Sequence, residues 1–226
     1  MRTSPRSKRA LQLLAATAAA MSITAALAGT AAPETTHEAS QAAAIMTAVP
    51  STLAADAVLA QITDADGALR FEVAEDGTRF VWADPSVFTA RLAPYGAPFL
   101  TQGYIYPAGT LSARADGVNA DGSPQFPEAV LGEWTCYGWY LGGGMNASSG
   151  TRILATQIYQ FGDAWGAVTL VSDGYVPTTN GAAVDRAITG GTGPFTTVRG
   201  AVRETALGIN ETSGSNARFE IRLVTP

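Results

Sequence analysis

The chain has 226 residues, and its 14 basic and 19 acidic side chains give a net charge of −5. An acidic chain without a basic patch repels phosphate, which excludes nucleic acid and anionic membrane surfaces as partners. The single cysteine, Cys136, excludes an intrachain disulfide, so stability must come from packing. The single histidine, His37, excludes His-dependent triads and His-rich metal sites, and we expect no metal site.

The first 28 residues have the pattern of a signal peptide. Four basic residues precede an alanine-rich apolar run over 10–27, and Ala26-Leu27-Ala28 provides the small-x-small pattern that a signal peptidase cleaves. The alternative is a retained membrane anchor, for which this weakly apolar run is marginal in length. We predict a signal peptide at 1–28, a secreted protein and no membrane association after cleavage. Loss of the leader leaves ten basic residues against 19 acids, a net charge of −9.

The mature chain divides into a tail and one domain. Residues 29–62 are predicted to be a flexible Ala/Thr-rich segment with a short helix near Thr52–Ile62. Residues 63–226 are enough for one domain and contain no long amphipathic helix. They show apolar runs of about five to nine residues, rich in β-branched and aromatic residues and separated by Asp-Gly turns. The predicted strands are 69–74, 79–82, 99–106, 132–141, 153–161, 167–175, 186–189, 195–207 and 218–224.

Many short strands without helical crossovers predict an all-β fold with antiparallel pairing. Closing the sheet removes its exposed edges, so we predict an eight-stranded antiparallel β-barrel in preference to a sandwich. A barrel of about eight strands has an interior just wide enough for side chains or one small ligand.

Alternation along the strands separates an inner from an outer face. In 218–224 the charged residues alternate with Phe219, Ile221 and Leu223, which predicts a wall with one wet and one dry side. In 132–141 both faces carry aromatic residues. The outer face of that strand is therefore expected to meet a loop or a neighbouring subunit.

The segment 187–202 predicts a β-hairpin corner, because four glycines fall within eleven residues. Its sequence Ile188-Thr189-Gly190-Gly191-Thr192-Gly193, followed by Phe195 and Val198-Arg199-Gly200, resembles the signature hairpin of the dirigent and allene oxide cyclase barrel superfamily. Thr101-Gln102-Gly103-Tyr104-Ile105-Tyr106 is similar to the family's glutamine-glycine-aromatic strand, and 166–174 resembles the strand before the hairpin. The resemblance spans about 69–224, and the composition fits a bacterial, exported member.

The resemblance implies an allene oxide cyclase/dirigent-like barrel with an axial ligand cavity, a homotrimer and no cofactor. Members cyclise a reactive fatty-acid epoxide, or steer the coupling and cyclisation of phenoxy radicals and quinone methides, by holding the substrate in one reactive conformer. Arg199 matches the arginine that faces the pocket in dirigent members, and the alternative for it is a surface or subunit contact. Pro194 stands where some dirigent members carry an acidic pocket residue, so the dirigent acid–base chemistry does not transfer directly.

The predicted catalytic residues are Glu133 and Arg199. Glu133 precedes an aromatic-rich strand, where apolar surroundings would raise its pKa, and the alternative is a solvated strand-end acid paired with an arginine. The predicted substrate-binding residues are polar or aromatic side chains within strands, and the alternatives for them are the packed core and the outer face. They are Gln102, Tyr104, Tyr106, Trp134, Gln157 and Tyr159.

Three functions are compatible with this sequence. The first is an intramolecular isomerase or cyclase, or a stereochemical guide, acting on a small apolar or phenolic metabolite inside the barrel. The second is a non-catalytic exported barrel that binds a ligand or serves a structural role. The third is a β-sandwich carbohydrate-binding module, for which Trp82 and Trp165 would lie on one flat exposed face.

Overall fold

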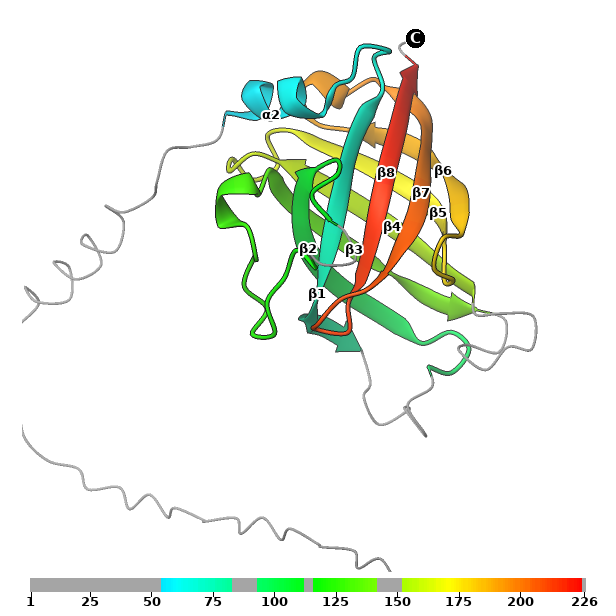
Figure 1. Cartoon of the computed structure of the whole chain (residues 1–226). Helices are drawn as coiled ribbons and strands as arrows, with labels where there is room; N and C mark the ends of the chain where they lie inside the picture. Colours follow the sequence, from blue (N-terminus) through cyan, green and yellow to red (C-terminus); the bar gives the residue numbers. More distant parts are fainter. Residues whose placement is uncertain (1–53, 83–92, 112–115, 142–151, 225–226) are drawn as a thin grey trace, which may run out of the picture. The chain divides into compact units, whose positions relative to one another are not determined.

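The computed structural model describes residues 54–82, 93–111, 116–141 and 152–224. The predicted signal peptide and most of the predicted flexible segment lie outside these residues. The described chain starts with helix α2, Ala55–Ile62, where a short helix was expected. Its residues Val58 and Ile62 are buried in the same apolar core as the barrel. Helix α2 thus packs against the end of the barrel at which the first strand begins (Figure 1).

Eight antiparallel strands close into one barrel, in which neighbours along the chain pair and the last strand pairs with the first (Figure 1). This arrangement confirms the predicted all-β, eight-stranded antiparallel β-barrel. The strands are β1 (Leu69–Trp82), β2 (Pro98–Pro107), β3 (Gly132–Leu141), β4 (Arg152–Phe161), β5 (Thr169–Val176), β6 (Ala183–Gly191), β7 (Arg199–Ile209) and β8 (Ser215–Val224).

The strands predicted at 69–74 and 79–82 are one continuous strand, β1. Its pairing with β2 shifts register between Asp76 and Val81, as in a β-bulge. The Asp76 carboxylate accepts a hydrogen bond from the Thr78 backbone N–H at 2.9 Å. Asp76-Gly77 therefore forms a local turn inside a strand, whereas the sequence indicated a turn between two strands.

The predicted hairpin corner joins β6 to β7, but its second strand starts at Arg199 and not at Phe195. Residues Gly193–Phe195 form a short 3₁₀ helix, η4, in which Pro194 has no N–H to offer to a strand ladder. Gly193 has a φ of 59°, and a Cβ at this position would lie 2.6 Å from the carbonyl oxygen of Ala167. Glycine is therefore required at this corner for both its backbone conformation and its size.

Aromatic rings fill part of the barrel interior. Phe71 stacks on Phe219 with ring centroids 5.3 Å apart, and it meets Tyr159 and Phe161 edge-on at 5.4 and 5.6 Å. All four side chains are almost completely buried. Each such aromatic pair contributes about 0.5–1.5 kcal/mol beyond the burial of apolar area.

The outer wall has an apolar half over β2–β5. Leu100 faces Tyr137 across β2 and β3, while Trp139, Leu154 and Tyr175 lie in one cross-strand row over β3, β4 and β5. All five side chains are exposed, at 39–52% of their surface. The predicted aromatic outer face of residues 132–141 is thus present, and within the described chain no loop buries it.

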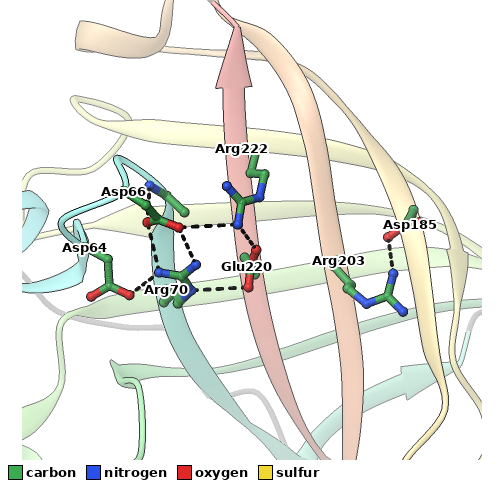
Figure 2. A network of polar contacts seen from close by, with 8 residues as sticks. Asp64, Asp66, Arg70, Asp185, Arg203, Glu220 and Arg222 are labelled. Carbon is green, nitrogen blue, oxygen red and sulfur yellow. Dashed lines mark hydrogen bonds and ion pairs between the residues drawn. The ribbon is translucent and has the colours of Figure 1, made fainter.

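The other half of the wall, over β6, β7, β8 and β1, carries alternating charges (Figure 2). Arg70, Glu220, Arg203 and Asp185 lie in one cross-strand row. Arg70 Nε is 3.2 Å from Glu220, and Arg203 Nη1 is 3.2 Å from Asp185. The inner face of β8 buries Phe219 and Ile221, which confirms the predicted wet and dry sides.

A long connection covers the outside of β1 and β2. Residues 107–111 and 116–131 cross this face, and Ala74, Tyr106 and Leu111 form a second small core beneath them. The Tyr106 hydroxyl donates to the carbonyl of Gly117 at 2.6 Å. Some outward-facing side chains of the barrel are therefore as deeply buried as inward-facing ones.

Candidate functional site

A polar cluster lies inside the barrel among the aromatic rings. It joins five buried side chains from four consecutive strands through hydrogen bonds and one ion pair. The members are Gln157 and Tyr159 on β4, Ser172 on β5, Arg186 on β6 and Glu204 on β7. Burial of five polar side chains costs free energy unless they are paired with one another. The cluster is therefore a candidate functional site.

Glu204 is the centre of this cluster. Its Oε2 atom accepts a hydrogen bond from Gln157 Nε2 at 3.0 Å and lies 3.5 Å from Arg186 Nε. The Tyr159 hydroxyl donates to Gln157 Oε1 at 2.6 Å and lies 3.0 Å from Ser172 Oγ. The Glu204 carboxylate is thus oriented by an amide, which is itself held by a phenol.

Arg186 is held in place by backbone carbonyls. Its Nη1 donates to the carbonyls of Gly174 and Tyr175 at 3.0 and 2.8 Å, and its Nη2 donates to the carbonyl of Ala155 at 2.7 Å. The guanidinium therefore ties β4, β5 and β6 together on the inside. It also places a fixed positive charge beside Glu204.

Burial sets the protonation of the two interior carboxyls. Burial raises the pKa of Glu204 to about 7, against the opposing effects of Arg186 and the Gln157 hydrogen bond, and nearby Glu75 raises this pKa further. Burial also raises the pKa of Glu75, while a hydrogen bond from the Ser215 backbone N–H opposes the shift. Glu204 can therefore give or take a proton near neutral pH, as a general acid or base requires.

Glu75 and Glu204 face a common cavity of about 90 Å³. Trp134 also lines it, and its indole Nε1 is buried without a hydrogen-bond partner among the described residues. A buried donor left unpaired costs free energy, which an acceptor oxygen of a bound molecule would recover. The remaining walls are mostly apolar and include Val73, Phe80, Phe99, Thr101, Cys136, Tyr140, Ile153, Val176, Ser215 and Ala217.

A second hollow of about 120 Å³ lies next to this cavity. The two share Val176, Glu204, Ser215 and Ala217 in their walls. The second hollow is otherwise lined by the β5–β6 turn, residues 177–180, and by the β7–β8 end of the barrel. Glu204 therefore lies at the boundary between the interior cavity and a hollow at one end of the barrel.

Three of the predicted substrate-binding residues point into the barrel. Gln157 and Tyr159 belong to the polar cluster, and Trp134 lines the cavity. The structure does not bring the predicted catalytic pair, Glu133 and Arg199, to this site.

Glu133 lies on the outer face, because its neighbour Trp134 points inward and successive side chains of a strand alternate. Its Oε1 atom is 2.7 Å from Arg79 Nη1, which is the alternative considered from the sequence, an acid paired with an arginine. The expectation that Glu133 acts inside the barrel is therefore corrected. Arg199 is exposed at the start of β7, where its Nη1 donates to the carbonyl of Val198 at 2.8 Å, and its expected pocket role is corrected as well.

The remaining predicted binding residues, Gln102, Tyr104 and Tyr106, also lie outside the barrel. They alternate with the inward-facing Thr101 and Ile105 on β2, so all three share the outer face. Tyr106 is buried beneath the covering connection, while Tyr104 donates to the carbonyl of Gly122 at 2.8 Å. The prediction that these residues line the interior is corrected.

Sequence reasoning missed Glu204, Arg186, Ser172 and Glu75. Alternation along the strand is a signal for two of them. Glu204 is two residues from Val202, and Arg186 is two residues from Ile188, so each shares a strand face with an aliphatic residue. Charged residues in phase with buried aliphatic residues point into the barrel. Arg199 and Glu204 lie on opposite faces of β7, and Arg186 on β6 is the arginine that meets Glu204.

The described residues contain no candidate metal site and no reactive thiol. Among them no three His, Cys, Asp or Glu side chains are grouped to hold a metal ion. Cys136 is buried, and burial raises the pKa of its thiol well above the ordinary value, so it stays protonated at neutral pH. In the same part of the chain, no helix has the length and apolar character needed to cross a membrane.

Comparisons with known proteins find similarity in solved structures. No protein-family model matches the chain, and no curated protein sequence matches it. The pterocarpan synthase dirigent proteins GePTS1 and PsPTS1 are similar at 17% and 18% identity, with TM-scores of 0.48 and 0.49. Each alignment covers 70% of this chain and 85% or 94% of the dirigent protein. A pyocyanin demethylase is similar at 14% identity and a TM-score of 0.45, over 70% of this chain and 99% of that one.

Proposed function

We propose that this chain is a secreted barrel protein that binds a small apolar or phenolic metabolite in its interior and guides the cyclisation or isomerisation of that metabolite without a cofactor. One observation carries the proposal. A nearly fully buried carboxyl, Glu204, with a pKa of about 7, faces a mostly apolar cavity. A group in this state exchanges protons with a bound ligand at neutral pH.

The cavity has the parts that an intramolecular ring closure requires. Apolar walls restrict the conformers of the ligand, which brings its reacting atoms together. Protonated Glu204 donates a proton to the oxygen that leaves carbon, and the second carboxyl, Glu75, accepts a proton from the attacking hydroxyl. The Trp134 indole N–H supplies a hydrogen bond to a ligand oxygen. The product has the same atoms as the substrate, so no further reactant is required.

The variant Glu204→Gln tests this role with a probe of matching chemistry, racemic ortho-(oxiranylmethyl)phenol, whose phenol closes on its own epoxide to give a chiral dihydrobenzofuran. The wild type is expected to accelerate closure and to favour one enantiomer. Glutamine keeps the shape of the side chain but cannot donate an acidic proton, so the variant should lose about 10²–10⁴-fold in rate. Chiral chromatography of timed samples measures both quantities.

The matched control is Glu220→Gln, which removes a carboxyl from the outer wall (Figure 2) and should leave the rate unchanged. Equal rates for Glu204→Gln and wild type would contradict the catalytic role. The second candidate function is a barrel that binds a ligand without reaction. The hydrogen bond from Gln157 and the ion pair with Arg186 favour it, because such pairing of a buried carboxyl also serves stability alone. Binding of the probe detected by native mass spectrometry, without acceleration of closure, would support that alternative.

We further propose that the protein is a homotrimer whose subunits meet at the apolar outer half of the wall. Trp139, Leu154 and Tyr175 form an exposed row on this half, and such a contiguous apolar surface is typical of interfaces. Trp139→Asp should convert trimer to monomer, because a carboxylate cannot be buried unpaired in an apolar interface. Native mass spectrometry measures the change, and Arg203→Ala on the charged half is the control. A wild-type protein that is monomeric would contradict the proposal.

A further inference from the structure

The outer face of the barrel carries a further pocket, which shares no lining residue with the interior cavity or with the hollow beside it. Its volume is about 310 Å³, and its walls come from the outer faces of β2 and β3, the bulged end of β1 and the β4–β5 connection. It contains three side chains whose chemistry the interior does not use, Arg79, Glu133 and Trp165. A concave pocket of this size matches the small end of known ligand sites.

Arg79 forms the polar centre of this pocket. Its Nε is 2.8 Å from Asp76 Oδ2, its Nη1 is 2.7 Å from Glu133 Oε1, and its guanidinium lies over the Tyr104 ring at 4.9 Å from the centroid. Its third nitrogen, Nη2, is buried and has no hydrogen-bond partner in the described part of the chain. The unpaired Arg79 Nη2 donor thus lies beside the Glu133 carboxylate. Glu133 accepts one hydrogen bond from Arg79, and its oxygens have capacity for further hydrogen bonds.

Trp165 supplies an aromatic surface at the same pocket. It is 77% exposed, the most exposed of the large apolar side chains described. The loop that carries it is held by Gln160, whose Nε2 donates to the carbonyl of Ala164 at 3.0 Å and whose Oε1 accepts from the Gly166 N–H at 2.7 Å. These hydrogen bonds fix the backbone on both sides of Trp165. The exposed ring is therefore presented on a positioned loop, which lowers the entropy lost on binding.

The charges of the pocket and its unpaired donor together favour a neutral ligand. Three acids, Asp76, Glu133 and Asp163, lie at or beside it, so an anion is repelled. A cation is attracted by the net negative charge but has no acceptor to offer to Arg79 Nη2, so it leaves that donor unpaired. A hydroxyl group both accepts and donates, so neighbouring hydroxyls satisfy Arg79 Nη2 and Glu133 together.

We propose that this outer pocket is a sugar-binding site. The apolar C–H face of a pyranose ring packs on Trp165, while adjacent ring hydroxyls accept from Arg79 Nη2 and donate to Glu133. The site is independent of chemistry in the barrel interior. It gives an exported barrel a means of attaching to saccharide while its interior cavity stays available.

Isothermal titration calorimetry with defined sugars tests the assignment on the mature full-length protein. The probes are glucose, xylose, galactose, N-acetylglucosamine and their soluble β-linked oligomers, with choline as the organic-cation probe. The wild type should bind at least one sugar, and Trp165→Ala should weaken that binding about tenfold or more through loss of the ring contact. Tyr95→Ala, which removes another exposed aromatic ring, is the matched control and should bind as the wild type does.

Arg79→Lys gives a second test, because lysine keeps the positive charge but loses the fork that holds Glu133, Asp76 and the ligand together. The sugar affinity of Arg79→Lys should fall below that of the wild type. Unfolding of this variant, followed by circular dichroism, shows whether the fold is kept. No binding of any sugar by the wild type would overturn the proposal. Equal sugar affinity of wild type and Trp165→Ala, or binding of choline in place of sugars, would overturn it as well.

Discussion

Arg186→Met is expected to destabilise the barrel by about 3–5 kcal/mol, because three buried carbonyls lose their donor and Glu204 loses the cation that favours its charged form. In the wild type Arg186 neutralises Glu204 and satisfies carbonyls of Gly174, Tyr175 and Ala155. Methionine fills similar apolar volume but donates no hydrogen bond, so these acceptors are left unsatisfied inside the protein. Urea unfolding followed by tryptophan fluorescence measures the loss of stability.

The control for this substitution is Arg203→Met, which breaks the ion pair with Asp185 on the outer wall (Figure 2). Both side chains of that pair are more than half exposed, so the expected loss is below about 1 kcal/mol. The double variant Arg186→Met with Glu204→Gln should recover part of the stability, since no ionisable carboxyl is then left buried without its cation. Similar stabilities for Arg186→Met and Arg203→Met would show that the interior pair is not structurally important.

The stability of the wild type is expected to fall as pH rises from about 4.5 to about 7, by roughly 3 kcal/mol from Glu204 alone. The pKa of this carboxyl is raised from 4.5 to about 7 in the folded chain. Between these two values the folded state binds more protons than the unfolded state, so added base favours unfolding. Above pH 7 the whole penalty is present, and below pH 4.5 it is absent.

Urea unfolding at pH 5, 6, 7 and 8 measures this dependence. Glu204→Gln should reduce it, while the raised pKa of Glu75 leaves a slope of the same sign. Glu220→Gln should keep the wild-type slope, because Arg70 and Arg222 lower the pKa of Glu220, whose effect therefore falls below pH 4.5. A variant Glu204→Gln with the full wild-type slope would show that Glu204 titrates as an ordinary surface carboxyl.

The interior site could be predicted only in part from the sequence. Gln157, Tyr159 and Trp134 were selected because polar and aromatic residues in the middle of a strand need partners. The structure pairs Gln157 and Tyr159 inside the barrel, while Trp134 lines the cavity with its indole N–H unpaired among the described residues. Glu133 was selected because of its aromatic neighbours, but these lie on both faces of β3 and do not reveal which face the carboxyl shares. The neighbours of a residue in sequence are not its neighbours across a sheet.

Tyr106 illustrates a second limit. A buried tyrosine in a barrel strand suggests an inward-facing side chain, yet Tyr106 is buried on the outer face under residues 107–111 and 116–131. Whether a connection folds back over a sheet depends on contacts between distant residues, such as the Leu111 N–H and the Glu72 carboxylate at 2.7 Å. Alternation along a strand does not contain that information.

The sequence by itself determined the closed antiparallel barrel, because strand alternation and glycine corners are local properties that are written in consecutive residues. It also determined the two faces of β8 and the hairpin between β6 and β7. Only the tertiary structure decided that Glu204 meets Arg186 and Gln157, and that Arg79 meets Glu133. These contacts join residues 18 to 54 positions apart. They depend on strand register and on which faces are covered, and both are fixed only when the barrel closes.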